Sequence, residues 1–182
     1  AEKNGDTIST AANTKFADIP AHAWYSGYVK YLSNNGITYG KSKTIFAPND
    51  AITRAEFTTM AVRFFDVYGD GDAEIMEQFS GFNDVSSGYW AAEYIKYAAL
   101  HGWINGYGDG SFHADREINR AEVVTIVNRL LGREADEDYI ADNLRKLNTF
   151  PDVSRKHWAY YAVMEAANAH TAVLDESESW SK

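Results

Sequence analysis

Apolar positions recur at helical spacing in several segments of this chain. The segment from Trp24 to about Asn35 places apolar or small residues on one face, and the pattern returns after Trp90 and from Trp158 to about His170. Two further segments, starting at Arg54 and Arg120, each carry an apolar stripe. Such spacing is typical of amphipathic helices. The pattern therefore predicts an all-α fold, with shorter helical segments near residues 73–79 and 136–147.

The same landmarks occur three times along the chain. The motif Phe-x-Asp-(Ile/Val) begins at Phe16, Phe82 and Phe150, with an offset of 66 residues and then of 68. A fixed period indicates one supersecondary unit used repeatedly. We expect one domain over residues 16–182, with repeats at about 16–80, 81–149 and 150–182. Residues 1–15, small and polar, are expected to form a linker from an upstream region.

Local signals mark where these helices begin and end. Thr53 and Glu56 have the spacing of a capping box, and Asn119 and Glu122 repeat it in the second copy. Gly36 follows the first helix of the first copy, and Gly102 follows that of the second. We expect both helices to end at these glycines, in the left-handed backbone conformation.

The third copy departs from the pattern after its first helix. The second copy continues with the loop Asn105-Gly106-Tyr107-Gly108-Asp109-Gly110-Ser111-Phe112 and the box Asn119-Arg120-Ala121-Glu122. Neither the loop motif nor the Arg-Ala-Glu box follows His170. The box arginine can therefore be named in two copies only.

Composition narrows the classes of function. The net charge of −9 argues against a nucleic-acid partner and against binding to anionic membranes by charge. No apolar run reaches the length of about 18 residues needed to span a bilayer. No pair of carboxylates is singled out for catalysis, and no spacing of His, Asp or Glu indicates a metal. We expect neither an enzyme nor a cofactor.

The motifs resemble the S-layer homology (SLH) family. The landmarks are Phe-x-Asp-Val, a Trp at the first helix, Gly-Tyr-x-Asp-Gly-x-Phe, and Thr-Arg-Ala-Glu at the second helix. The resemblance covers about residues 16–170 and implies a pseudo-threefold spindle, with a central three-helix bundle and outward prongs. It also implies an extracellular location and noncovalent anchoring of an exported protein to a secondary cell-wall polymer of a Gram-positive bacterium. The usual family epitope is a pyruvylated N-acetylmannosamine.

The residues of the motifs suit such a ligand. A guanidinium grips a carboxylate through paired hydrogen bonds, and a helix N-terminus also favours an anion. The architecture that the resemblance implies would place Arg54 beside Asp84 and Trp90, and Arg120 beside Asp152 and Trp158, as the expected ligand-binding groups. Gly106 and Tyr107 complete the expected ligand-binding set.

Each of these residues also has a purely structural interpretation. The arginines could bridge neighbouring repeats, the Trp side chains could wedge helices into the core, and the Asp side chains could cap turns. An alternative function is a protein-interaction or self-assembly module of a surface layer, because an aromatic share of 14% would serve that function too.

Overall fold

The structure, a computed structural model, describes residue 8 and residues 12–68, 79–174 and 178–181. Contacts divide the chain into two compact units: residues 1–52 with 62–71, and residues 53–61 with 72–182. The predicted helix at 73–79 lies outside the described residues apart from Phe79, which is not helical. Most of the predicted linker, residues 1–15, also lies outside them.

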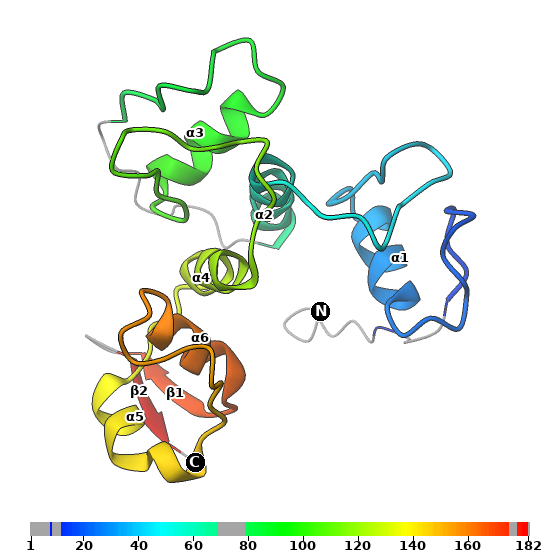
Figure 1. The fold of residues 1–182 in the computed structure, drawn as a ribbon. Helices are drawn as coiled ribbons and strands as arrows, with labels where there is room; N and C mark the ends of the chain where they lie inside the picture. The colour runs from blue at the N-terminus through cyan, green and yellow to red at the C-terminus, as the bar shows by residue number, and fades with distance from the viewer. Residues whose placement is uncertain (1–7, 9–11, 69–78, 175–177, 182) are drawn as a thin grey trace. The chain divides into compact units, whose positions relative to one another are not determined.

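The first unit contains α1 (Ser26–Asn34) and the end of α2 (Arg54–Tyr68). Its core is formed by Phe16, Ile19 and Val29, against which Tyr25 and Phe46 pack. The predicted helix from Trp24 is confirmed, although it begins two residues later. Figure 1 shows α1 in blue, followed by the long loop that returns toward α2.

The second unit contains the start of α2, followed by α3 (Ala92–Leu100), α4 (Arg120–Leu130), α5 (Glu137–Asn143), the 3-10 helix η2 (Leu144–Lys146) and α6 (Tyr160–Ala167). The helical segment predicted at 136–147 is confirmed as α5 and η2. Helix α4 packs against α6, and the side-chain amide of Asn128 donates to the carbonyl oxygen of Ala162 at 2.9 Å.

The predicted helical class is confirmed, and one two-stranded sheet adds to it. Strands β1 (Thr171–Leu174) and β2 (Glu178–Ser181) pair antiparallel, with Thr171 opposite Ser181. In Figure 1 this hairpin lies beside α5 and α6. Trp180 closes a core with Ile140, Tyr160 and Met164. The sequence pattern did not predict this hairpin.

The repeated aspartates close a loop in each of the first two copies. Asp18 accepts from the backbone amides of Phe46 at 2.9 Å and Ala47 at 2.7 Å. Asp84 accepts from the equivalent amides of Phe112 and His113, both at 2.7 Å. These bonds to backbone amides keep the pKa of Asp18 below its ordinary value. The turn-capping interpretation of these aspartates therefore matches the geometry.

Other local signals are also confirmed. Gly36 and Gly102 have φ values of 72° and 69°, which is the left-handed conformation expected after α1 and α3. Both capping boxes form reciprocal bonds: Thr53 with Glu56, and Asn119 with Glu122. The helices in the described residues are all too short or too polar to cross a membrane.

Candidate functional site

The start of α2 is fixed by the segment that precedes α4. Thr53 and Glu117 form an antiparallel bridge, and the amides of Arg54 and Ala55 donate to the carbonyl oxygens of Arg116 and Ala114 at 2.9 and 3.0 Å. The first amides of a helix otherwise lack partners. Because those of α2 are bonded to backbone carbonyls, they are not open to an anion, and only the Arg54 side chain can reach one.

The Arg54 side chain is buried in the loop of the second copy, where it is 5% exposed. Its Nε donates to Phe112 O at 2.9 Å and its Nη2 to Asn105 O at 3.2 Å. The guanidinium carbon lies 4.5 Å from the centre of the Phe112 ring and 5.2 Å from that of Tyr107. Arg54 therefore joins the first copy to the second, as its structural interpretation expected.

Glu122 is the carboxylate partner of Arg54. Its Oε1 lies 2.8 Å from Arg54 Nη1, accepts from the Tyr107 hydroxyl at 3.0 Å, and also pairs with Arg116. Burial alone would raise the pKa of Glu122. Hydrogen bonds from Asn119 and Tyr107 and the charges of the two arginines have the larger opposite effect, so the pKa lies below its ordinary value. Glu122 is thus a stable anion at neutral pH.

A pocket of about 350 Å³ opens beside this network. It brings together one predicted arginine, one predicted tryptophan and the predicted Gly-Tyr pair of the loop. Its wall is formed by Arg54, Trp103, Ile104, Asn105, Gly106, Tyr107, Glu122, Thr125, Ile126, Arg129 and Trp158. A pocket of this size accommodates a small molecule or one or two sugar rings.

The charges in the pocket wall do not cancel. Arg54 is neutralised by Glu122 at 2.8 Å, whereas Arg129 is exposed. With the Asn105 amide turned to satisfy its neighbours, its oxygen accepts from Arg129 Nη1 at 3.2 Å. A neutral amide leaves the guanidinium charge uncompensated. The pocket wall therefore carries one excess positive charge, next to the exposed indole of Trp158.

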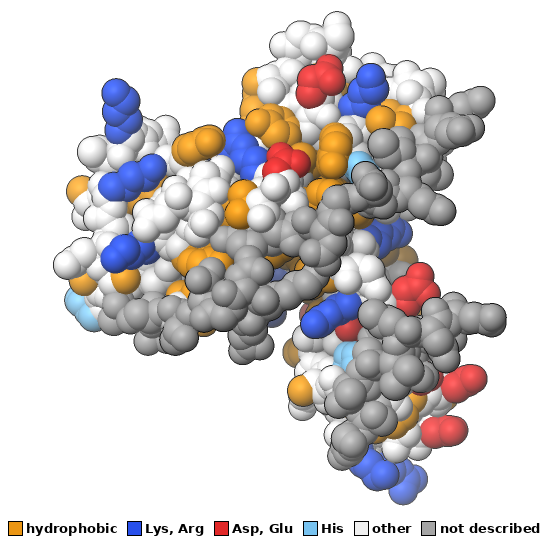
Figure 2. Space-filling model, turned by 180° about the vertical axis from the view of Figure 1, so that it is seen from behind, with side chains coloured by type: hydrophobic (Ala, Val, Ile, Leu, Met, Phe, Trp, Pro, Cys, Tyr) orange, Lys and Arg blue, Asp and Glu red, His pale blue; other side chains and the backbone are white. Residues whose placement is uncertain are grey.

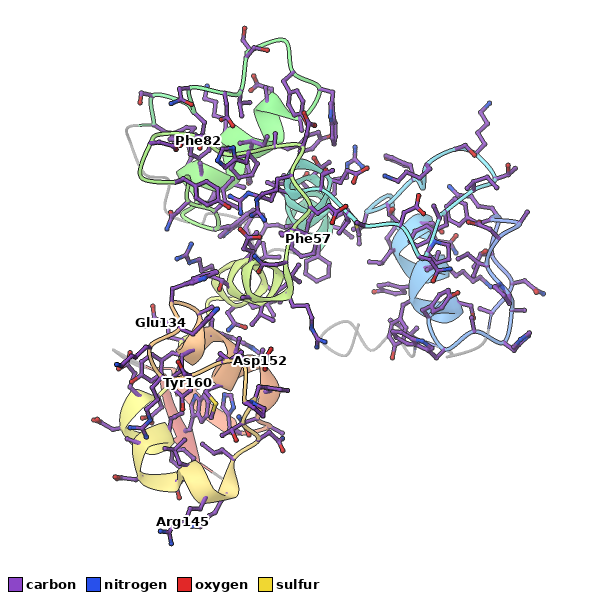
Figure 3. The ribbon with its side chains drawn as sticks, in the orientation of Figure 1. Phe57, Phe82, Glu134, Arg145, Asp152 and Tyr160 are labelled. Atoms are coloured by element: carbon purple, nitrogen blue, oxygen red, sulfur yellow. The ribbon has the colours of Figure 1, made fainter. Side chains whose placement is uncertain are left out.

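The loop backbone sits tightly on Phe82, which is labelled in Figure 3. A Cβ on Gly106 would lie 2.4 Å from the Phe82 ring and 2.6 Å from Ser111 O, so only glycine fits there. Asp109 caps the turn by accepting from the Ser111 amide at 2.9 Å. Packing and capping together present Tyr107 at the pocket wall.

Four of the eight predicted ligand residues lie at the pocket: Arg54, Gly106, Tyr107 and Trp158. The sequence paired Arg54 with Asp84 and Trp90, whereas the structure combines Arg54 with Trp158. Asp84 is engaged by backbone amides, and Trp90, 56% exposed, lies beside Tyr89.

The remaining two predicted residues, Arg120 and Asp152, are exposed outside the pocket wall. Within the described part of the chain, neither side chain forms a hydrogen bond or an ion pair. The predicted pairing of Arg120 with Asp152 and Trp158 is thus not assembled in this structure.

Sequence reasoning missed Arg129, and it missed Trp103 as well. The available signal was the repeat itself, since Arg129 follows Arg63 by the same 66 residues that separate the other landmarks. Arg63 lies 4.7 Å from the centre of the Tyr39 ring, and Tyr39 corresponds to Asn105. The arginine and the first loop residue thus meet in both copies.

Charged side chains elsewhere do not form an obvious second site. Figure 2 shows Lys and Arg side chains scattered among uncharged surface on that face of the described residues. No cluster of three His, Asp or Glu side chains suited to a metal ion occurs within the described residues.

Two segments of the chain, residues 15–58 and 81–124, match the S-layer homology domain family. These segments contain the first two predicted copies up to their capping boxes. The third copy lies outside both segments and stays a prediction.

Several curated relatives are named as cell-surface, anchoring or S-layer proteins. The chain is 32% identical to Cell surface glycoprotein 1 and 29% identical to the Cellulosome-anchoring protein, both of Acetivibrio thermocellus, over 97% and 89% of its length. It is also 32% identical over 64% of its length to the S-layer protein sap of Bacillus anthracis. The chain spans only 8%, 34% and 14% of these proteins. The two matched segments and these relatives indicate a location at the bacterial cell surface.

Proposed function

We propose that this module anchors an exported protein to the bacterial cell wall by binding an anionic sugar of a secondary wall polymer in the pocket of Arg129 and Trp158. A pyruvylated N-acetylmannosamine is the proposed epitope. The name of one relative, a cellulosome-anchoring protein, supports an anchoring function. The excess positive charge beside an exposed aromatic ring is the observation that carries the proposal.

The chemistry of the epitope suits this wall. A pyruvate ketal gives an otherwise neutral sugar one carboxylate, and a guanidinium binds a carboxylate through charge-assisted hydrogen bonds. Arg129 supplies that group, and the Trp158 indole, 64% exposed, offers a flat apolar face for the sugar ring. Arg54 contributes less charge because Glu122 neutralises it, but two of its five N–H groups remain after its bonds to Phe112, Glu122 and Asn105.

Calorimetric titration with synthetic pyruvylated N-acetylmannosamine, alongside the same sugar lacking pyruvate, tests the proposal. We expect binding only to the pyruvylated sugar. Arg129→Gln and Trp158→Ala should each weaken binding by about tenfold or more, as loss of a charge-assisted bond or of a stacking face does. The controls Arg120→Gln, at an exposed arginine of the same helix, and Trp90→Ala, at the equivalent tryptophan of the second copy, alter residues outside the pocket wall and should leave binding unchanged.

The opposite pattern would refute this assignment. Equal binding of both sugars would remove the role of the carboxylate, and loss of binding in Trp90→Ala but not Trp158→Ala would move the site. Purified wall sacculi, with and without their secondary polymer, provide a second measurement. Retention of the module only by sacculi that keep the polymer is the expected result.

We also propose that the three copies assemble as a pseudo-threefold spindle around a central three-helix bundle. The similar offsets of the landmarks, 66 and 68 residues, and the burial of Ile95, Ala98 and Ala99 in α3 support this arrangement. A crystal structure of the chain would test it, since three equivalent helices should then meet at one axis.

A further inference from the structure

Arg120 occupies the position in the second copy that Arg54 occupies in the first. Each arginine is the first residue of its helix, and each helix begins with a capping box. Yet Arg54 is only 5% exposed and is held by the loop of the second copy, while Arg120 is exposed. The side chain of Arg120 forms neither a hydrogen bond nor an ion pair within the described residues. Arg120 therefore occupies the motif position from which Arg54 joins two copies, but its side chain makes no such contact within the described residues.

The structure explains why Arg120 has no loop to enter. After α6, where the second copy has its loop after α3, residues 171–174 and 178–181 form the paired strands β1 and β2. The amide of Trp180 donates to Asp136 Oδ2 at 3.0 Å, whereas the equivalent Phe112 amide donates to the repeated Asp84. The hairpin thus replaces the loop backbone that would receive an arginine.

The first copy contains a loop of the right kind. We call residues 38–47 the repeat-one loop and residues 104–113 the repeat-two loop. Both are closed by a repeated aspartate, and both place a glycine, Gly40 or Gly106, against a Phe ring, where a Cβ would come within 2.6 Å or less. The amide of Lys41 donates to Ile45 O at 2.9 Å, as that of Tyr107 does to Ser111 O at 2.8 Å.

The acceptors that hold Arg54 have open counterparts in the repeat-one loop. Arg54 is held by the carbonyl oxygens of Asn105 and Phe112. The matching carbonyl oxygens, those of Tyr39 and Phe46, accept no hydrogen bond from the described residues. Phe46 also supplies a ring where Phe112 lies under the guanidinium.

We propose that Arg120 of one copy of this chain binds the repeat-one loop of a second copy, so that copies associate head to tail. The contact would reproduce the hydrogen bonds of Arg54 to the repeat-two loop, with Arg120 donating to Tyr39 O and Phe46 O of the neighbour. Two different surfaces meet in such a contact, which closes into a ring or continues as a chain. This inference is independent of sugar binding.

The sequence also indicates that the contact is weak. Lys41 stands where the repeat-two loop has Tyr107, so that a like charge replaces an aromatic face for the guanidinium. Replacing Lys41 with Tyr should therefore strengthen association by about tenfold or more, because it removes a repulsion and adds a cation–π contact.

Sedimentation equilibrium of the 182-residue chain, from about 1 μM to 1 mM, tests the proposal. We expect concentration-dependent association that is lost in Arg120→Gln and in Tyr39→Lys, which places a cation beside the acceptor carbonyls. Arg145→Gln, at an exposed arginine that projects away from the second unit in Figure 3, is the matched control and should associate like the unaltered chain.

Mixing the two defective variants gives the sharpest test. Arg120→Gln keeps an intact repeat-one loop, and Tyr39→Lys keeps Arg120, so the mixture should form one-to-one pairs that grow no further. Circular dichroism shows whether each variant is folded. A chain that stays monomeric to 1 mM even with Lys41→Tyr would overturn the proposal, as would association that both variants retain.

Discussion

Arg54 and Glu122, which are 68 residues apart in the sequence, form an ion pair of 2.8 Å at the wall of the pocket. Their side chains are only 6% and 10% exposed. The pair joins the first helix position of one copy to the capping glutamate of the next. Arg54 therefore joins the first copy to the second, and its side chain also lines the pocket.

Removal of the Arg54 side chain should cost stability. Arg54→Ala leaves Glu122 with Arg116 as its one cationic partner among the described residues and leaves two carbonyl oxygens without a donor, so we expect a loss of about 3 kcal/mol in the free energy of unfolding. Arg120→Ala, at the same motif position but exposed, should change it by less than about 0.5 kcal/mol. Urea denaturation followed by circular dichroism measures both, and equal effects would contradict the buried connection.

Two neighbouring glycines should respond in opposite ways to the same change. Gly106→Ala forces a Cβ to 2.4 Å from the Phe82 ring and 2.6 Å from Ser111 O, so the loop must move. Nothing lies within 4 Å of a Cβ at Gly108. We expect a loss of about 2 kcal/mol for Gly106→Ala and of less than about 0.5 kcal/mol for Gly108→Ala, measured by thermal denaturation. A destabilised Gly108→Ala would show that the loop is constrained elsewhere.

Two aspartates of the repeated motif should also differ in how much they contribute to stability. Asp84→Ala deletes the acceptor of two backbone amides and should destabilise the chain by about 2 kcal/mol. Asp152→Ala changes an exposed side chain without a hydrogen-bond partner in the described residues, and should be nearly neutral. Comparison of the two midpoints in urea provides the measurement. Similar midpoints would mean that the loop closure contributes little.

Acid should weaken the fold through Glu122. Its pKa is lower in the folded chain than its ordinary value of 4.5, because hydrogen bonds and two arginines outweigh the effect of burial. A lowered pKa gives stability that is present above the unfolded value and lost as the pH falls through the folded one. Between about pH 5 and pH 3, the free energy of unfolding should therefore decrease.

Glu122→Gln should reduce the slope of this decrease, while Glu117→Gln, at an exposed carboxylate on the preceding segment, should preserve it. Urea titrations at several pH values provide the measurement. An unchanged slope in Glu122→Gln would assign the acid sensitivity to other carboxylates, of which Asp18 and Asp84 also have lowered pKa values.

The local elements were readable from the sequence because their signals are local. The capping boxes at Thr53 and Asn119 and the left-handed stops at Gly36 and Gly102 depend on residues within one turn of each other. The buried face of α6 was harder to place, because its buried residues are Tyr160, Met164 and Glu165, and one of these is a carboxylate. The hairpin packs on α5 and α6. A tertiary contact of this kind produces no periodic pattern of apolar residues in the sequence.

The site depended on distant pairings that one copy alone does not reveal. The motif identified Arg54 and Trp158 but not that they share a pocket, because the choice among three equivalent tryptophans is made by packing. The ion pair of Arg54 with Glu122 was not predicted, because the capping box already accounted for a glutamate at position 122. Arg129 escaped notice because an exposed arginine on a helix carries no local signal of its own.

The aspartate that closes each loop also bears on how the chain reaches its fold. Asp18 and Asp84 bind amides 28 and 29 residues further along, so each closure is made within one copy. The entropic cost of closing a loop grows only with the logarithm of its length, so closures of this length are less costly than contacts between copies. We therefore expect each copy to bring its own first helix and loop together before it packs against a neighbouring copy. The contact of Arg54 with the next loop is then expected to form after each copy has closed its own loop, and to couple the two copies.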